Sequence, residues 1–540
     1  MRQHLANPEK QHLTHMRVFL GDLFNKSAAL DLESFLIQRF AGDGQFNVLN
    51  RNEGVTNANY YDRLRYEVEF ERIFDELYEQ GLFAHTLPEI ENSDLFKLSP
   101  FKSLNSDQMF AINDILRGLF SDLAAGRSST ISIQGDPGTG KTIVGIYLMK
   151  MLEDIKAWSP DVDDVAEQDN ESPLAAYFTH ENAQLLAGFT LGLVVPQQSL
   201  RDSIARVFKR TPGLHPRMVM TPFTVGKSEA NFDLLIVDES HRLTQRANQS
   251  SGPLNKSYAD ITERLFGNRD DFTKTQVDWI QAKSTHQLFL MDIDQTVRPM
   301  DIPAEVLEKL QASTRHDDPE QNRSYVLSTQ MRVKGGADYI RHAKHLLTSA
   351  SLTTEWPAMG DYDFRVFDNL SEMREAIFKR DDEVGLSRLL SGYGFEWKSK
   401  NDSSAADIEL DGLRLQWNTS ATDWVSKAGS VHEVGSIHTI QGYDLNYAGV
   451  IFAPELHFDP ETQEFSLDRS SYFDAKGKEN SPKLGRMYGD DDLLTYVKKI
   501  YGVLLTRGMR GTYVYAATPE VRDFLRALPV PASNTDSPQG

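Results

Sequence analysis

A glycine-rich segment of the chain has the residue types and spacing of a loop that holds phosphate groups. It matches the pattern G-x-x-x-x-G-K-[ST] in full and consists of Gly135, Asp136, Pro137, Gly138, Thr139, Gly140, Lys141 and Thr142. Glycine permits backbone conformations in which successive N–H groups point at one anion. We expect Lys141 to reach the β- and γ-phosphates of ATP, and Thr142 to hold Mg²⁺.

Two adjacent carboxylates follow an apolar run further along the chain. Leu234–Val237 is continuously apolar and leads directly into Asp238 and Glu239. Such a run predicts a buried strand of a parallel sheet, whose carboxyl end is where these sheets bind ligands. Asp238 suits a role beside Mg²⁺, and Glu239 suits the base that polarises an attacking water. Two acids that merely favour a helix N-terminus are the weaker interpretation.

Both motifs lie where short β-rich runs alternate with helical patterns. Thr130–Gln134 precedes the phosphate loop and Thr142–Leu152 follows it, and Leu191–Val195 is followed in the same way by Gln198–Lys209. This alternation predicts a parallel sheet with crossover helices. A second block of strands is expected at Ser324–Leu327, Phe364–Phe367, Glu433–Ile437, Gly449–Phe452 and Gly511–Tyr515.

The whole chain therefore indicates an α/β protein with a mainly helical N-terminal region. Apolar residues recur three and four apart in Val18–Ala29, Leu32–Phe40 and Tyr66–Leu82, which is typical of helices. The boundaries that we expect are a helical accessory region over 1–98, a first α/β unit over 99–300, a second with insertions over 301–525, and a disordered tail over 526–540.

The charge of the chain limits how it can meet nucleic acid. It contains 57 Lys and Arg against 78 Asp and Glu, a net charge of −21. This balance disfavours a general cationic coat for nucleic acid but leaves room for one basic groove. Much of the acid falls in residues 1–98, Asp161–Glu171 and Glu455–Asp492, away from the motifs. We expect an acidic exterior around a narrow neutral or positive groove.

Composition also excludes several kinds of site. The chain has no cysteine, so it has no disulfide, no thiolate metal site and no cysteine nucleophile. Its N-terminus lacks the apolar core of a secretory signal, and no apolar stretch is long enough to cross a bilayer. We expect a cytoplasmic protein without a membrane partner.

Further segments surround the two motifs in a fixed order. They are Leu104–Gln108, Val194–Gln198, Met220–Phe223, Leu288–Gln295, Leu327–Arg332, Val434–Asp444 and Tyr501–Gly511. In content and order they resemble the motifs of superfamily 1 helicases, and most closely the Schlafen-group-3-like DNA/RNA helicase domain of uncharacterised bacterial proteins. The resemblance covers about residues 100–520. It implies two RecA-like parallel-sheet P-loop NTPase units with ATP bound between them.

The resemblance implies a role for individual residues on the nucleotide side. Gln108 would read the adenine through its amide, and Gln295 would sense the γ-phosphate. Arg332 would reach the ATP from the second unit, and Arg507, with Arg510 in reserve, would be the second arginine that stabilises transition-state charge. The remaining nucleotide candidates are Gln441, Gly442 and Asp444, and the candidates for contact with a nucleic-acid strand are Thr221, His438 and Thr439.

These motifs predict an ATP hydrolase that works as a nucleic-acid motor, a helicase or a single-strand translocase. Its expected partner is single-stranded or forked DNA or RNA, between which the sequence does not distinguish. The alternative is an ATP-controlled switch or defence sensor that binds nucleic acid or a protein without unwinding. A protein partner would suit the N-terminal region or the acidic insertions. A metabolic kinase would leave Gln295, Arg332 and Arg507 unexplained.

Overall fold

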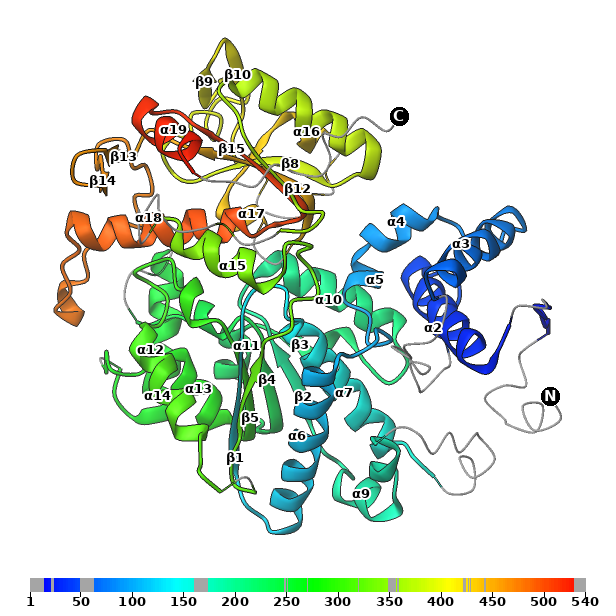
Figure 1. Ribbon diagram of the computed structural model, residues 1–540. Helices are drawn as coiled ribbons and strands as arrows, with labels where there is room; N and C mark the ends of the chain where they lie inside the picture. Colours follow the sequence, from blue (N-terminus) through cyan, green and yellow to red (C-terminus); the bar gives the residue numbers. More distant parts are fainter. Residues whose placement is uncertain are drawn as a thin grey trace.

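The computed structural model places two α/β units one above the other (Figure 1). The residues that it describes are 14–20, 24–48, 63–159, 173–246, 249, 251–269, 271–318, 320–347, 356, 359–420, 424–425, 427, 429–440 and 443–528. Gln441, Gly442, the acidic loop expected at Asp161–Glu171 and the chain beyond residue 528 lie outside them. What we predict for those positions therefore stays a prediction.

The first sheet consists of six parallel strands in the order β3-β2-β4-β5-β1-β6. These strands are β1 (Ser129–Gly135), β2 (Leu191–Val194), β3 (Val219–Met220), β4 (Phe232–Val237), β5 (Ser284–Met291) and β6 (Ser324–Leu327). In β4, Leu234 and Ile236 pack into the core on one face, while Leu235 and Val237 pack into the core on the other. A strand buried on both faces needs apolar residues throughout, which explains the uninterrupted run.

Helices cover both faces of this sheet. They are α6 (Ser106–Ala124), α7 (Lys141–Lys156), α9 (His180–Leu185), α10 (Gln198–Arg210), α11 (Pro222–Lys227), α12 (Gly252–Phe266), α13 (Gln276–Lys283) and α14 (Ala304–Thr314). Helices α6, α7 and α10 contribute to the core on one face, and α13 and α14 to the core on the other. The carboxyl ends of the strands are left to present functional side chains, as is usual in open parallel sheets.

One strand belongs to a different sheet from the one that the sequence suggests. The pattern predicts Ser324–Leu327 in the second unit, and this prediction is wrong, because β6 pairs in parallel with β1 from Ser132 to Gly135. Periodicity identifies a strand but carries no information about which sheet has a free edge for it. The first unit therefore extends past the boundary expected at residue 300.

The second sheet has five parallel strands in the order β11-β8-β12-β15-β7. They are β7 (Asp363–Val366), β8 (Ser387–Ser391), β11 (Val434–Gly435), β12 (Leu445–Phe452) and β15 (Gly508–Ala516). The helices of this unit are α15 (Gly336–His345), α16 (Leu370–Val384), α17 (Ile437–Ile440), α18 (Asp490–Leu505) and α19 (Pro519–Arg526). Two antiparallel pairs, β9 (Ile408–Leu410) with β10 (Leu413–Leu415) and β13 (Leu456–Asp459) with β14 (Glu464–Leu467), lie in the insertions. Two parallel sheets confirm the predicted α/β class.

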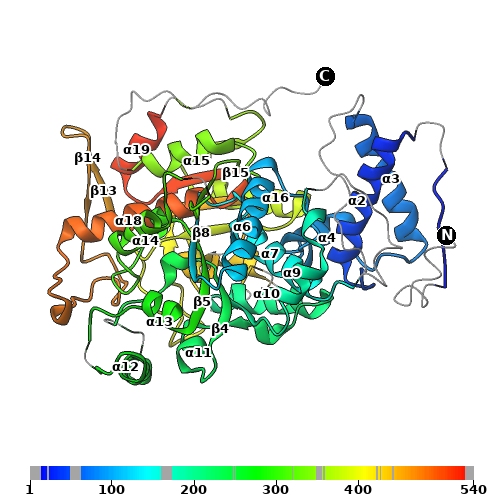
Figure 2. The ribbon, with the colours of Figure 1, turned by 90° about the horizontal axis from the view of Figure 1, so that it is seen from below.

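The N-terminal region is helical and has a small core of its own. Its helices are α2 (Lys26–Asp43), α3 (Arg63–Glu79), α4 (Leu87–Asn92) and α5 (Asp94–Lys97). Figure 2 shows α2 and α3 to one side of the rest of the molecule. A helix from Val18 is not found, because residues 14–20 form none and α2 starts after Asn25, whose side chain accepts a hydrogen bond from the Ala28 N–H. Asn25 is a favourable N-cap residue, which explains the later start.

The N-terminal helices contact both α/β units. Asp94 pairs with Arg206 of α10 in the first unit at 2.8 Å. The Asn92 side chain donates to the Val384 carbonyl oxygen of the second unit at 3.3 Å. The region is therefore docked at the junction of the two units.

The C-terminal helix extends slightly further than expected. Helix α19 includes Arg526, and Leu528 is buried, so the tail cannot begin at residue 526. Among the described helices, none is long and apolar enough to cross a membrane.

Candidate active site

The phosphate loop joins β1 to α7, as its sequence pattern requires. Gly138 (φ 88°) and Gly140 (φ 81°) have left-handed backbone conformations, which favour glycine. The Lys141 ammonium is buried and donates to the carbonyl oxygens of Gly135 at 2.7 Å and Asp136 at 3.1 Å. The loop thus wraps around the Lys141 ammonium. This ammonium lies where the loop would bind phosphate oxygens.

Two oxygen-bearing side chains meet at the start of α7. The Thr142 hydroxyl donates to the Asp238 carboxylate at 2.8 Å, and Asp238 is almost completely buried. Burial, reinforced by the charge of Glu239, raises the pKa of Asp238. A hydroxyl and a carboxylate beside a phosphate loop are the ligands that Mg²⁺ takes in such sites, so these two residues fit the ion.

Glu239 is held in a strained conformation beside a buried histidine. Its backbone is left-handed (φ 50°, ψ 46°), which costs a non-glycine residue about 1–3 kcal/mol. Its Oε2 lies 2.9 Å from Nε2 of His241, whose side chain is fully buried. Burial alone would raise the pKa of Glu239, but His241, Lys141 and Arg507 outweigh burial and hold it well below its usual range. Glu239 is therefore an ionised carboxylate at neutral pH.

A chain of hydrogen bonds connects the two units beside the loop. Arg507, two residues after α18, donates to the Gln295 amide oxygen at 3.3 Å. The Gln295 nitrogen in turn donates to Asp292, the residue after β5, at 2.7 Å. Arg507 is buried, and burial together with the neighbouring Arg332 lowers its pKa to about 10. The structure thus brings together Gln295 and Arg507, which lie far apart in the sequence.

Arg332 reaches the site from a different place than expected. It follows β6, an edge strand of the first sheet, rather than a strand of the second unit. Its guanidinium pairs with Asp444 of the second unit at 2.7 Å. The residues before it rest on the phosphate loop, because Gln330 donates to the Pro137 oxygen at 2.7 Å and the Met331 N–H to the Gly138 oxygen at 3.1 Å.

The approach of this segment requires a glycine in the loop. A β-carbon added at Gly138 would lie 2.1 Å from the end of the Gln330 side chain, which could move, but also 2.9 Å from the Cβ of Arg332, closer than β-carbons pack. Position 138 therefore needs glycine for its backbone conformation and for the close contact with this segment.

Gln108 is buried against the loop with both ends of its amide in use. Its nitrogen donates to the Thr139 carbonyl oxygen at 2.8 Å, and its oxygen accepts from the Asn105 N–H at 3.1 Å. The second contact belongs to the capping box that starts α6. The capping role that the sequence allows is thus present, and reading of adenine stays a prediction. Met331, whose sulfur lies 3.2 Å from this amide, is half exposed beside it.

The three nucleic-acid candidates come from both units. Thr221 caps α11 in the first unit and, among the described residues, has no hydrogen bond to the other two. His438 and Thr439 lie in α17 of the second unit. The Thr439 hydroxyl is buried and bonded to the Ser436 backbone, whereas the His438 carbonyl accepts from Gln197 of the first unit at 3.4 Å.

The motifs of the sequence do not include several charged residues of the site. Lys97, the last residue of α5, and Lys102, between α5 and α6, feel the charges of Asp444 and Arg332. Burial lowers the pKa of both lysines, to about 8 for Lys102. No spacing rule marks them, because only docking of the N-terminal helices brings them here. The sequence indicated His241 only weakly, through its position just after the acid pair.

The chain belongs to the family described as Schlafen group 3, DNA/RNA helicase domain, which matches residues 128–518. An uncharacterized protein of Saccharomyces cerevisiae is 25% identical over 413 residues, which cover 73% of this chain and 83% of the yeast protein. Because this relative is from yeast, the expected bacterial distribution finds no support in it.

Some solved helicase structures are similar at low identity. A complex of the arterivirus nonstructural protein 10 helicase with DNA is 11% identical, with a TM-score of 0.28, over 74% of this chain and 62% of that one. Pif1 helicase from Candida albicans is 10% identical, with a TM-score of 0.26, over 79% of this chain and 100% of that one. Similarity at this level provides no residue correspondences.

We predict that Lys102 makes nucleotide binding depend on pH. Because its pKa is about 8, the lysine is charged at pH 7 and largely neutral at pH 9, so a cation near Asp444 and Arg332 is lost in between. The affinity for fluorescent ADP, measured by anisotropy, should fall severalfold over this range. Lys102→Ala should bind more weakly at pH 7 and lose most of the pH dependence. The control Lys379→Ala, exposed on α16, should match the parent protein. An unchanged profile in Lys102→Ala would contradict the assignment.

Proposed function

We propose that the protein is an ATP hydrolase of the superfamily 1 helicase type that moves along or separates nucleic-acid strands. The observation that carries this proposal is the meeting of three groups at one junction. These groups are a phosphate loop with Lys141, an acid pair with Glu239, and arginines that lie at the contact of the two units. Membership in a helicase-domain family supports a nucleic-acid motor in general terms.

The chemistry follows from the charges in the site. When ATP enters, Lys141 exchanges the carbonyl oxygens of its own loop for β- and γ-phosphate oxygens. Thr142 and Asp238 would hold Mg²⁺, which would supply charge neutralisation for the phosphates. Ionised Glu239 accepts a hydrogen bond from the attacking water and orients it toward the γ-phosphate. Arg332 and Arg507 then stabilise the charge that develops on the transferred group.

Hydrolysis would move the units because the same residues hold them together. Arg507 and Gln295 connect α18 to the end of β5, and Arg332 and Asp444 connect the end of β6 to the second unit. A change in charge at the phosphates alters the equilibrium between these contacts and an open cleft. We propose Thr221 and His438 as contacts to the strand on either unit. Thr439 would first have to release Ser436.

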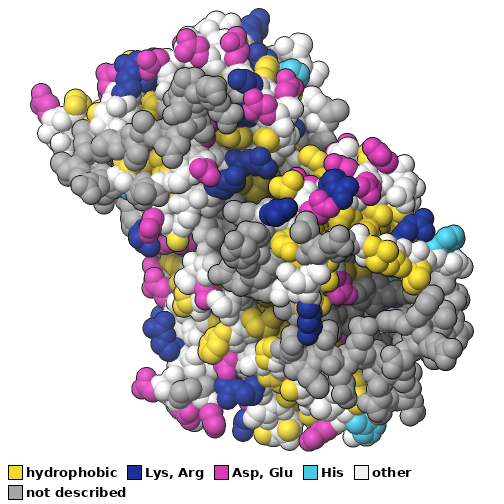
Figure 3. Space-filling view, turned by 45° about the vertical axis from the view of Figure 1, so that its right-hand side comes forward, with side chains coloured by type: hydrophobic (Ala, Val, Ile, Leu, Met, Phe, Trp, Pro, Cys, Tyr) yellow, Lys and Arg dark blue, Asp and Glu magenta, His cyan; other side chains and the backbone are white. Residues whose placement is uncertain are grey.

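The surface is compatible with a narrow path for a polyanion. Figure 3 shows Lys and Arg side chains gathered near the middle of one face, with acidic side chains distributed around them. The net charge of −21 therefore does not by itself argue against a nucleic-acid partner. The alternative, an ATP-controlled switch, is favoured by the segment from Gln330 to Arg332, which rests directly on the phosphate loop.

Stimulation of ATP hydrolysis by nucleic acid separates these two functions. We expect the ATPase rate to rise severalfold with single-stranded or forked DNA or RNA, and to fall back as salt rises because phosphate contacts release counterions. Lys141→Ala should show no hydrolysis in any condition, since it lacks the charge on the β- and γ-phosphates. Basal activity that no nucleic acid changes would reject the motor and favour the switch.

Glu239→Gln should separate binding from chemistry. The amide keeps the size of the side chain but cannot accept a proton from water, so kcat should fall by about 10²- to 10⁴-fold. Affinity for ATP should change little, because Lys141 and the loop backbone remain intact. Equilibrium binding of fluorescent ATP and single-turnover hydrolysis give the two values. Normal turnover would show that another group orients the water.

A further inference from the structure

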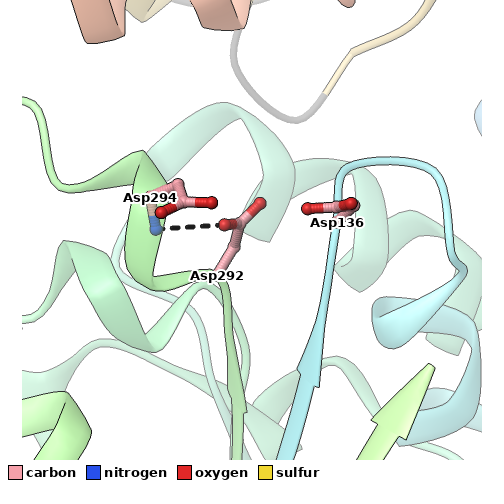
Figure 4. A group of neighbouring side chains, drawn as sticks. All are labelled: Asp136, Asp292 and Asp294. Atoms are coloured by element: carbon pink, nitrogen blue, oxygen red, sulfur yellow. Dashed lines mark hydrogen bonds between the residues drawn. The ribbon is translucent and has the colours of Figure 1, made fainter. Parts of the chain in front are cut away.

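Three carboxylates converge on one side of the phosphate loop. Asp136 belongs to the loop, while Asp292 and Asp294 follow β5, and their oxygen atoms lie within 4.8 Å of one another (Figure 4). Asp292 is fully buried and accepts a hydrogen bond from the Asp294 N–H at 3.2 Å. Asp136 and Asp294 are 43% and 68% exposed, so the repulsion weighs most on the buried Asp292, which a nearby cation would stabilise.

The cation is a lysine from the other unit. Lys344 extends from α15, and its Nζ lies 2.6 Å from Asp136, 3.2 Å from Asp294 and 3.7 Å from Asp292. Only 16% of its side chain is exposed. Burial alone would lower the pKa of Lys344, but the carboxylates outweigh burial and raise it. The ammonium is charged throughout the neutral pH range, and it offsets one of the three negative charges of the cluster.

Lys344 is one of two cations that approach the same acid from the second unit. Asp292 contacts Lys344 through Oδ1, and it accepts the Gln295 amide through Oδ2. Gln295 in turn accepts from Arg507. Lys344 lies in α15 and Arg507 lies two residues after α18, and these two helices pack against each other. Lys344 of α15 and Arg507 after α18 thus contact the acid and the amide of the first unit, respectively.

We propose that Lys344 is a positioning residue of the ATPase site. Its ammonium holds the phosphate loop and the residues after β5 against the second unit, and thereby places Gln295 and Arg507 beside the phosphates. This inference rests on the proposed function. Without Lys344, three carboxylates would face the space where the triphosphate charge is expected, and the two units would separate more easily.

The chain offers a matched control on the same helix. Lys344→Met removes the charge and keeps an apolar stem, Lys344→Gln removes the charge and keeps a donor, and Lys344→Arg keeps the charge. Arg341→Met removes a cation one turn earlier, where the side chain is 67% exposed and pairs with Asp338 of its own helix. If only the total charge of α15 mattered, Lys344→Met and Arg341→Met would have equal effects.

The first experiment measures the contact without any nucleotide. Because the chain has no cysteine, Ala125→Cys and Glu375→Cys give one specific spin label on each unit. Pulsed electron spin resonance should show one main distance in the parent protein and in the Arg341→Met and Lys344→Arg variants. Lys344→Met and Lys344→Gln should show broader and longer distances. Distributions identical to that of the parent would overturn the proposal.

The second experiment tests the effect on chemistry. Lys344→Met should lower kcat by about 10- to 100-fold, as misplaced reacting groups do, with a smaller change in KM. Lys344→Arg should recover most of the rate, and Arg341→Met should match the parent. Equal kcat values for Lys344→Met and Arg341→Met would overturn the positioning role. If the parent protein hydrolyses no ATP, the proposed function fails, while the label distances still decide whether Lys344 holds the units together.

Discussion

Every charged group buried near the phosphate loop must have a partner of opposite charge, and most partners come from another part of the chain. Removing an unpaired ion from water costs several kcal/mol, far more than a surface ion pair returns. Lys141, Asp238 and Glu239 belong to the first unit, whereas Arg507 and Lys344 come from the second. Contacts between opposite charges thus help to hold the two sheets in their relative position. A ligand that changes the charge of the site would also change that position.

In the first unit, the residues that form the core are distinct from the residues that line the candidate site. Apolar strands such as β4 are covered by helices on both faces, so their side chains stabilise the unit and take no part in chemistry. Most candidate catalytic groups of the first unit lie in the residues immediately after the strands: the phosphate loop after β1, Asp238 and Glu239 after β4, Asp292 after β5. A stable core and a strained, charged edge can therefore exist in the same short segments, as the left-handed Glu239 illustrates.

Local patterns were sufficient for some of this structure and insufficient for the rest. The α/β class, the loop at Lys141 and the acid pair could be predicted because each depends on a few adjacent residues and their period. The assignment of β6 to the wrong unit shows the limit, since strand pairing is decided by which edge is free. Lys102 and Lys344 could not be found at all. They stand in ordinary helical or turn sequence and reach the site only through packing between distant segments.

The attachment of the N-terminal helices has a consequence for motion. Their link to the first unit includes an ion pair between Asp94 and Arg206, while their link to the second includes the neutral hydrogen bond from Asn92 to the Val384 carbonyl oxygen. If the cleft widens, the neutral hydrogen bond is the weaker of the two contacts and breaks first. The N-terminal helices then move together with the first unit. The boundary between the two moving parts would then lie between Asn92 and the end of α16.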